Sequence, residues 1–213
     1  MSKFSKMLIP ALALILLGHG CFGGKVAPTA DGGVFRTGDA GENFVQMNTI
    51  STDQGLGSIS GTDIRVIEID PQDNTVMYVG TLENGMVFTE NSGNTWRQPR
   101  TSALMSGSIN DIEVHPTETC TVYIAKLSRL YKTEDCSRSY DNEVFVESRA
   151  NVYVRRIAVD WFNPDVVYIG LSSGELFKTE DAGDTWQKIF SAGEAITEII
   201  LNLTDSRNIL IGT

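Results

Sequence analysis

The stretch Thr-Glu-Asp-Ala-Gly-Asp-Thr-Trp at residues 179–186 occurs in related form four times along the chain. A close copy lies at residues 89–96, and two more divergent copies lie at residues 133–140 and 37–44. The leading Thr residues of successive copies are 52, 44 and 46 positions apart, a period typical of stacked supersecondary units of propeller size. The repeat therefore indicates an architecture built from several similar units.

Each copy predicts a tight hairpin turn between two short strands. A Thr or Asx side chain can cap its own turn, the Gly allows a positive φ, and the aromatic residue covers the turn. The third copy departs from the pattern because Ser137 replaces the Gly. The expected turn residues are Asp39, Gly41 and Phe44 in the first copy, Asn91, Gly93 and Trp96 in the second, Asp135 and Tyr140 in the third, and Asp181, Gly183 and Trp186 in the fourth.

The pattern Ser/Thr-x-Asp-x-Gly-x-Thr-Trp resembles the Asp-box, or BNR, repeat of sialidase-like, xyloglucanase-like, sortilin-like and photosystem II assembly-factor-like β-propellers. The copies at residues 89–96 and 179–186 fit this pattern well. In those propellers the Asp-box is a structural turn at the periphery of a blade, away from any active site. The resemblance thus implies a fold and leaves the chemistry open.

The segments between the turns divide into strands at matching positions. Alternating apolar segments predict first strands at residues 64–71, 109–116 and 154–160, and second strands at residues 76–80, 121–125 and 166–170. Third strands are predicted at residues 86–89, 130–133 and 176–179, and a fourth strand follows each turn. Four antiparallel strands in about 45 residues make one propeller blade.

The two ends of the chain carry complementary half-blades. Residues 196–202 and 209–213 predict a first and a second strand, whereas residues 34–37 and 44–47 predict a third and a fourth. We expect residues 48–62 to be a polar, Gly- and Ser-rich connection. The sequence predicts an all-β propeller domain at residues 33–213, built from four-stranded antiparallel blades: three whole blades and one shared or truncated blade. A closed four-bladed ring and the N-terminal part of a longer propeller both fit this pattern.

The composition fits one domain and restricts the partners. The chain has 213 residues, of which 41% are hydrophobic, enough to form the core of a single all-β domain. Its formal net charge of −10 disfavours nucleic acid and anionic membrane surfaces as partners. We expect a monomer.

The N-terminus predicts export. Residues 1–20 combine two lysines with an apolar run and a small-residue end, which is the layout of a signal peptide. Cys21 follows a small residue, as at a bacterial lipoprotein cleavage site, so we expect a lipid on Cys21 and a tether at residues 21–32. This places the protein in the bacterial cell envelope, in contact with membrane only through the lipid. Ordinary cleavage nearby, followed by secretion, is the alternative.

Cys120 and Cys136 predict a disulfide. The second strand at residues 121–125 turns and returns at residues 130–133, which places the two cysteines opposite each other at the ends of a hairpin. An exported protein reaches a compartment that permits the bond. Two free thiols in a reducing compartment are the alternative.

The sequence assigns no catalytic residue, no metal site and no cofactor. Gly-x-Ser-x-Gly is absent, and His115, beside Pro116, is interpreted as a turn residue. Residues 34–37 do not match the Arg-Ile-Pro segment of sialidases. Xyloglucanase-like relatives use two facing carboxylates, and the sequence singles out no such pair among its 27 acidic residues.

Matching positions of the first strands predict a surface. In a propeller the first strand lies nearest the axis, so polar side chains at one position of each first strand are expected to line the central channel. These residues are Arg65, Asn110, Arg155 and Thr197, with Asp111, Arg156 and Glu198 as neighbours. A surface that binds a ligand or partner and a channel filled with water are both open interpretations.

Together these patterns predict an exported, lipid-anchored β-propeller that acts as a binding or assembly scaffold for a protein or glycan partner. The alternative is a glycoside hydrolase of the xyloglucanase-like or sialidase-like type. A hydrolase requires two acidic residues that converge at one mouth of the channel, whereas a scaffold requires only an exposed patch. We favour the scaffold over an enzyme.

Overall fold

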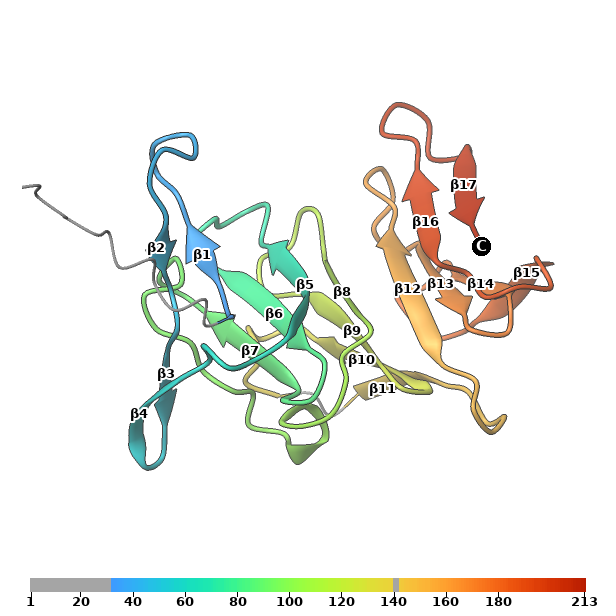
Figure 1. Cartoon of the computed structure of the whole chain (residues 1–213). Helices are drawn as coiled ribbons and strands as arrows, with labels where there is room; N and C mark the ends of the chain where they lie inside the picture. Colours follow the sequence, from blue (N-terminus) through green and yellow to red (C-terminus); the bar gives the residue numbers. More distant parts are fainter. Residues whose placement is uncertain (1–31, 140–141) are drawn as a thin grey trace, which may run out of the picture. The chain divides into compact units, whose positions relative to one another are not determined.

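The computed structural model describes residues 32–139 and 142–213. The expected signal peptide at residues 1–20, the lipidation site Cys21 and most of the tether lie outside the described residues, as does Tyr140. The described chain is nearly all β and contains one short 3₁₀ helix, η1 (Ser102–Leu104) (Figure 1).

Three antiparallel sheets form the predicted blades (Figure 1). The first blade pairs β5 (Ile64–Ile69), β6 (Met77–Thr81) and β7 (Met86–Thr89). The second pairs β8 (Asp111–Val114), β9 (Val122–Lys126), β10 (Arg129–Thr133) and β11 (Asn142–Val146), and the third pairs β12 (Val154–Val159), β13 (Val167–Leu171), β14 (Glu175–Thr179) and β15 (Gln187–Ser191). Strands pair in sequence order, as in a propeller blade. In the first blade the fourth strand is reduced to one bridge between Phe88 and Arg97.

The two half-blades at the chain ends are separate sheets. β1 (Phe35–Arg36) pairs with β2 (Val45–Gln46), and β16 (Glu198–Leu201) pairs with β17 (Ile209–Gly212). Within the described residues these two sheets do not pair with each other, so they do not form the expected shared blade. Each half-blade packs on its sequence neighbour instead, because apolar residues beside β1 and β2 cluster with the first blade, and those of β16 and β17 cluster with the third.

The segment at residues 48–62 is not an irregular connection. It contains a hairpin of β3 (Thr49–Thr52) and β4 (Gly55–Ser58). The hairpin is fixed to the first blade because the Ser51 N–H donates to the Trp96 carbonyl at 2.9 Å and the Trp96 N–H donates to the Thr49 carbonyl at 2.8 Å. The Gly- and Ser-rich composition concealed this strand pair, since its side chains are mostly exposed and carry little apolar pattern.

The four repeat turns share one hydrogen-bond pattern. In the turn at residues 179–186, the Thr179 hydroxyl donates to Asp181 Oδ1 at 2.6 Å and accepts the Gly183 N–H at 3.1 Å, and Asp181 Oδ1 accepts the Thr185 N–H at 2.8 Å. The same three bonds occur in the turns at residues 37–44, 89–96 and 133–140. The Thr and Asx side chains thus accept hydrogen bonds from backbone N–H groups of the turn that have no backbone partner of their own.

The repeat turns of the three blades each lie against the sheet that precedes them in the chain, and we call this contact a seam. In the third-blade seam, Trp186 Nε1 donates to the Val144 carbonyl at 2.8 Å. A Cβ on Gly183 would lie 3.0 Å from the Val144 Cβ, so the glycine permits close approach. In the first-blade seam, Trp96 Nε1 donates to the Met47 carbonyl at 2.5 Å. Apolar clusters between adjacent sheets form the core around these seams.

Cys120 and Cys136 form the expected disulfide, with Cα atoms 4.1 Å apart. The cysteines occupy the positions of Asp165 and Ala182 in the third blade, where the Ala182 N–H donates to the Asp165 carbonyl at 2.8 Å. The Cys136 N–H makes the equivalent bond to the Cys120 carbonyl at 3.4 Å. The disulfide is therefore added to a contact that the repeat already has.

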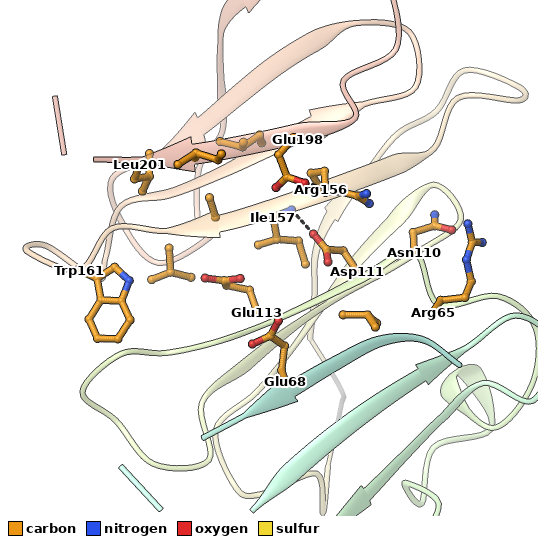
Figure 2. Close-up of a pocket in the computed structure, with 15 residues that line it drawn as sticks. Arg65, Glu68, Asn110, Asp111, Glu113, Arg156, Ile157, Trp161, Glu198 and Leu201 are labelled. Atoms are coloured by element: carbon orange, nitrogen blue, oxygen red, sulfur yellow. Dashed lines mark hydrogen bonds and ion pairs between the residues drawn. The ribbon is translucent and has the colours of Figure 1, made fainter. Parts of the chain in front are cut away.

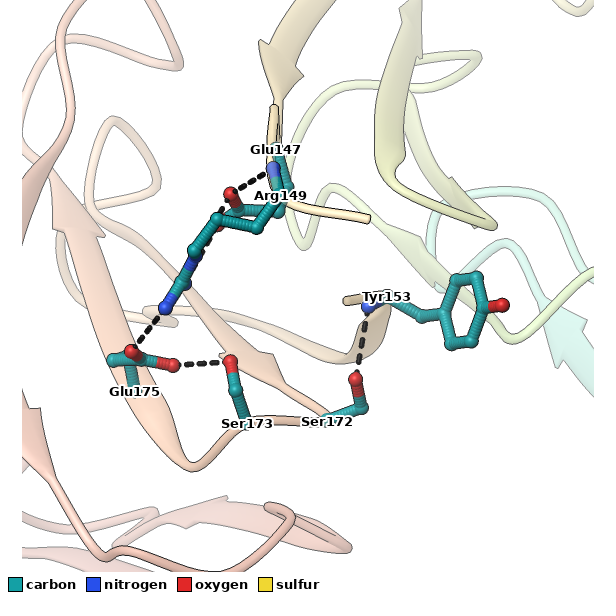
Figure 3. A network of polar contacts seen from close by, with 6 residues as sticks. All are labelled: Glu147, Arg149, Tyr153, Ser172, Ser173 and Glu175. Carbon is teal, nitrogen blue, oxygen red and sulfur yellow. Dashed lines mark hydrogen bonds and ion pairs between the residues drawn. The ribbon is translucent and has the colours of Figure 1, made fainter. Parts of the chain in front are cut away.

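An arginine clamp fixes the loop that leads from the second blade into the third (Figure 3). Arg149 contacts Glu147 through NH2 at 2.8 Å and Glu175 through NH1 at 2.6 Å, and Ser173 also donates to Glu175. The hydrogen bond from Arg149 lowers the pKa of Glu175 to about 2. Beside the clamp, the Tyr153 N–H donates to Ser172 Oγ at 2.9 Å. The clamp positions the start of β12, which contributes to the site described next.

Candidate functional site

The first strands β5, β8, β12 and β16 line a pocket of about 420 Å³, which we call the first-strand pocket (Figure 2). Its volume lies within the range of about 300 to 1,000 Å³ typical of small-molecule sites. Its walls combine apolar strand residues with a set of polar side chains and one tryptophan. The polar set comprises Arg65, Glu68, Asn110, Asp111, Glu113, Arg156 and Glu198, and the tryptophan is Trp161.

A β-bulge decides which side chains enter the pocket. β5 pairs Ile64 with Thr81 and Val66 with Gly80, so Arg65 is an extra residue in its strand, and Arg155 is the extra residue of β12. Beyond the bulge, side chains alternate between the two faces of the sheet. The third and fifth positions of the first strands therefore line the pocket: Val66, Asp111, Arg156 and Glu198 at the third, and Glu68, Glu113, Ala158 and Ile200 at the fifth.

Two of the four residues expected to line the channel line the first-strand pocket, and two do not. Arg65 and Asn110 line the pocket, whereas Arg155 and Thr197 do not. Arg65 NH1 donates to Ser108 Oγ at 2.8 Å, and Asn110 Nδ2 donates to the Val154 carbonyl at 2.8 Å. Their expected neighbours all line the pocket: these are Asp111, Arg156 and Glu198. In β12 the bulge at Arg155 moves the inward face by one residue and so brings Arg156 into the pocket.

Three carboxyl groups in the pocket have raised pKa values because they are buried. Burial, together with the nearby charge of Asp111, raises the pKa of Glu68 to about 7. Burial raises the pKa of Asp111 to about 6, although Asp111 Oδ2 accepts the Ile157 N–H at 2.8 Å and lies near Arg156. Burial, with the charges of Glu68 and Asp111, raises the pKa of Glu113 well above its ordinary value. Figure 2 shows the carboxyl groups of Glu68 and Glu113 turned toward one another in the pocket.

The two arginines of the pocket are held by neutral or exposed partners. Arg156 Nε lies 3.7 Å from Glu198 Oε2, and its NH1 donates to the Arg155 carbonyl at 2.9 Å. Arg65 has the bond to Ser108 described above. The pocket therefore offers hydrogen-bond donors on one part of its wall and carboxyl groups on another, a lining suited to a ligand that both donates and accepts.

Trp161 lies in the turn that follows β12 and is 51% exposed, and its neighbour Phe162 is 62% exposed. Asp160 holds this turn, because its Oδ1 accepts the Phe162 N–H at 2.8 Å. In the equivalent turns Asp70 and His115 accept the same backbone bonds, and the residues that follow them are Pro71 and Gln72, and Pro116 and Thr117. The turn needs its capping residue and does not need two exposed aromatic residues.

Sequence reasoning missed Glu68, Glu113 and Trp161. Glu68 and Glu113 occupy the same position in two aligned first strands, so the signal was an acidic residue repeated where the third strand has Ala158. Trp161 differs in kind from the prolines at its repeat position. The sequence does not reveal the bulges in β5 and β12, which determine the face of each of these strands that points into the pocket.

No three His, Cys, Asp or Glu side chains among residues 32–139 and 142–213 are placed to hold a metal ion. The same residues include no helix of the length and apolarity that crossing a bilayer requires.

Comparison with known proteins shows the fold. No family model matches the chain. A xyloglucanase of Hypocrea jecorina is 24% identical over 171 residues, which are 78% of this chain and 20% of the xyloglucanase. The chain thus spans about a fifth of the length of the curated relative that it matches.

Solved structures agree with this result. The GH74 xyloglucanase of Xanthomonas campestris has a TM-score of 0.66 at 15% identity, over 85% of this chain and 32% of that one. The extracellular domain of a putative one-component system of B. thetaiotaomicron has a TM-score of 0.62 at 16% identity, over 85% and 23%. YCF48 of Cyanidioschyzon merolae has a TM-score of 0.50 at 12% identity, over 67% and 48%. At these identities the likeness concerns architecture, and the chain has the β-propeller fold.

Proposed function

We propose that the chain is a binding module that takes a glycan at the first-strand pocket. The observation that carries the proposal is Trp161, an exposed indole at the edge of a polar pocket, in a turn whose geometry does not require it. The flat apolar face of a pyranose ring can pack on an indole, which offers a large rigid surface at low entropic cost. The fold is compatible with such a role, since propeller relatives include xyloglucanases.

The polar lining supports the same ligand class. A carboxyl group with a raised pKa is a donor and an acceptor at once, and a sugar hydroxyl also donates and accepts. Glu68, with a pKa raised to about 7, supplies this chemistry near neutral pH; the pKa of Glu113 is raised in the same direction, and Arg65 and Asn110 add further donors. A strongly anionic ligand would meet the carboxyl groups, so a neutral glycan suits the pocket best.

Calorimetric titration with a panel of neutral oligosaccharides, including fragments of xyloglucan, tests the proposal. The informative variant is Trp161→Pro with Phe162→Gln, which gives this turn the residues of its counterpart at Pro71 and Gln72. We expect the variant to fold and to lose roughly tenfold or more in affinity for the sugar that binds best. Equal affinity in wild type and variant, or no binding to any member of the panel, contradicts the proposal.

Glycoside hydrolysis is the second candidate, and one observation favours it. Asp111 and Glu113 are two positions apart on β8 and so lie on the same face. Burial raises the pKa of Asp111 to about 6 and raises the pKa of Glu113 well above its ordinary value, so both carboxyl groups are perturbed in the direction that a general acid needs. A hydrolase requires a pair of carboxyl groups, one of which acts as the general acid. Release of shorter products from the same oligosaccharides, abolished by Glu113→Gln, would establish this activity, and binding without products would exclude it for those substrates.

We further propose that the four repeat turns are Asp-box turns and that the protein is exported and lipid-anchored through Cys21. The shared Thr–Asx hydrogen bonds support the first statement, and the disulfide is compatible with export. Mass spectrometry of the mature N-terminus tests the anchor. An acylated Cys21 is the expected result, and an unmodified peptide that begins elsewhere contradicts it.

A further inference from the structure

The second-blade seam differs from the seams on either side of it. In the first-blade and third-blade seams, a glycine and a tryptophan bring the turn against the preceding sheet. In the second blade the glycine is replaced by Ser137, whose φ is 67° and whose Cβ occupies the position that must stay empty for the closest approach. A pocket of about 140 Å³ lies at this seam, which we call the seam pocket.

Three arginines line the seam pocket. Arg97 and Arg100 come from the chain that follows the first-blade turn, and Arg138 comes from the second-blade turn. The other lining residues are Phe88, Glu90, Gln98, Cys136 and Ser137. Arg97 NH1 pairs with Glu90 at 3.0 Å. Among the described residues, Arg100 and Arg138 have no ion pair with an acidic side chain, although the chain as a whole carries a net charge of −10.

The fold does not require Arg138. Its backbone N–H donates to Asp135 Oδ1 at 3.0 Å, a bond that any residue can make. The equivalent positions in the other three turns hold Glu42, Asn94 and Asp184. Two acids and an amide thus satisfy the same turn. The guanidinium of Arg138 is explained by the pocket that it lines and not by the turn.

We propose that the seam pocket binds a tetrahedral oxyanion, a sulfate or a phosphate group, held by Arg97, Arg100 and Arg138. Guanidinium groups present planar pairs of donors that match the oxygens of such anions. A water molecule occupies about 30 Å³ in the liquid, so the pocket has the volume of roughly four to five waters, enough for one small oxyanion. The disulfide at Cys136 fixes the turn that presents Arg138, which lowers the ordering cost of binding.

Titration calorimetry of the mature protein with sodium sulfate and sodium phosphate, at an ionic strength held constant with chloride, tests the proposal. We expect saturable binding that chloride does not reproduce. Arg138→Asn, which introduces the residue of the equivalent position Asn94, should weaken binding by roughly tenfold. Arg207→Ala removes an exposed arginine elsewhere and should leave binding unchanged. An O-sulfated monosaccharide in a parallel titration identifies the source: tighter binding than sulfate indicates an ester on a larger ligand, and weaker binding indicates the free anion.

Two results would overturn the proposal. One is the absence of a saturable signal with either anion in wild type. The other is wild-type affinity in both Arg138→Asn and Arg100→Gln, which remove lining arginines from two different segments of the chain. Thermal unfolding in chloride alone should give the same midpoint for wild type and both variants, since neither side chain supports the fold. The neutral-glycan titrations described above do not involve this pocket, so each proposal can fail without the other.

Discussion

The second-blade and third-blade turns make the same internal hydrogen bonds but join their neighbours in different ways. The third-blade seam is closed by Gly183 and Trp186, which bring the turn directly against Val144. The second-blade turn has Ser137 in place of the glycine and is tied instead to its own blade by the disulfide of Cys136. The hydrogen bonds inside the turn are thus the same in both blades, whereas the contacts that hold the turn in place differ: a glycine and a tryptophan in the third blade, and a disulfide in the second. The seam that lacks the glycine is also the one at which the seam pocket lies.

The largest effect is expected from Gly183→Ala. Gly183 has a φ of 108°, which an alanine tolerates poorly, and the new Cβ would lie 3.0 Å from the Val144 Cβ. Strain and overpacking together should lower the free energy of unfolding by about 3 to 4 kcal/mol. The matched substitution Ser137→Gly should cost less than about 0.5 kcal/mol, because it removes a side chain from a positive φ. Urea unfolding of both variants measures the contrast, and similar losses in the two would show that the seams are closed alike.

Removal of the disulfide by Cys120→Ser and Cys136→Ser is expected to have the next largest effect. The bond links residues 16 positions apart, and a loop of this length should contribute about 3 kcal/mol by restricting the unfolded chain. Reduction of the wild-type protein should give the same loss in chemical denaturation. A loss below about 1 kcal/mol would mean that the hydrogen bonds alone maintain the second-blade turn.

The pH dependence of stability separates the pocket from the seams. The pKa of Asp111 is raised to about 6 in the folded protein, so the folded state binds a proton more tightly than the unfolded state. The stability that proton binding to Asp111 contributes is fully present below about pH 4 and is lost as the pH rises through 6, by about 3 kcal/mol in total. Asp111→Asn keeps an acceptor for the Ile157 N–H and should flatten this dependence. Unfolding midpoints that respond to pH equally in wild type and variant would contradict the assignment.

The smallest contrast concerns two tyrosines at the same position of aligned second strands. The Tyr123 hydroxyl donates to the Ala182 carbonyl of the third-blade turn at 3.1 Å, whereas the buried Tyr78 hydroxyl has no hydrogen-bond partner in the described part of the chain. Tyr123→Phe should therefore lose about 1 kcal/mol and Tyr78→Phe about zero. Thermal unfolding of the two variants side by side measures the difference, and a greater loss for Tyr78→Phe would reverse the interpretation.

Much of this fold can be predicted from local sequence, because the residues that form each repeat turn lie within eight consecutive positions. The Thr–Asx–Gly pattern predicts the hydrogen bonds of the turns, and the aligned segments predict the blades. Cys120 and Cys136 fall at the facing ends of one hairpin, which a short turn closes. These features depend on contacts close in sequence, which is why they could be predicted.

The site depended on contacts that sequence does not show. The bulges at Arg65 and Arg155 shift the inward face by one residue, and only the pairing of β5 with β6 and of β12 with β13 shows them. The pKa values of Glu68 and Glu113 depend on burial between separate strands. The hairpin at residues 48–62 depends on hydrogen bonds to Trp96 rather than on its own apolar pattern.

The central claim is that the first-strand pocket binds a glycan against Trp161, while the other two tryptophans close seams. The chain has three tryptophans, so NMR of their indole N–H groups separates these roles in one titration. With a saturating oligosaccharide, we expect the Trp161 resonance to shift and the resonances of Trp96 and Trp186, which donate to backbone carbonyls, to stay in place. A Trp161 resonance that does not respond to any oligosaccharide, or a response confined to the seam tryptophans, would contradict the account.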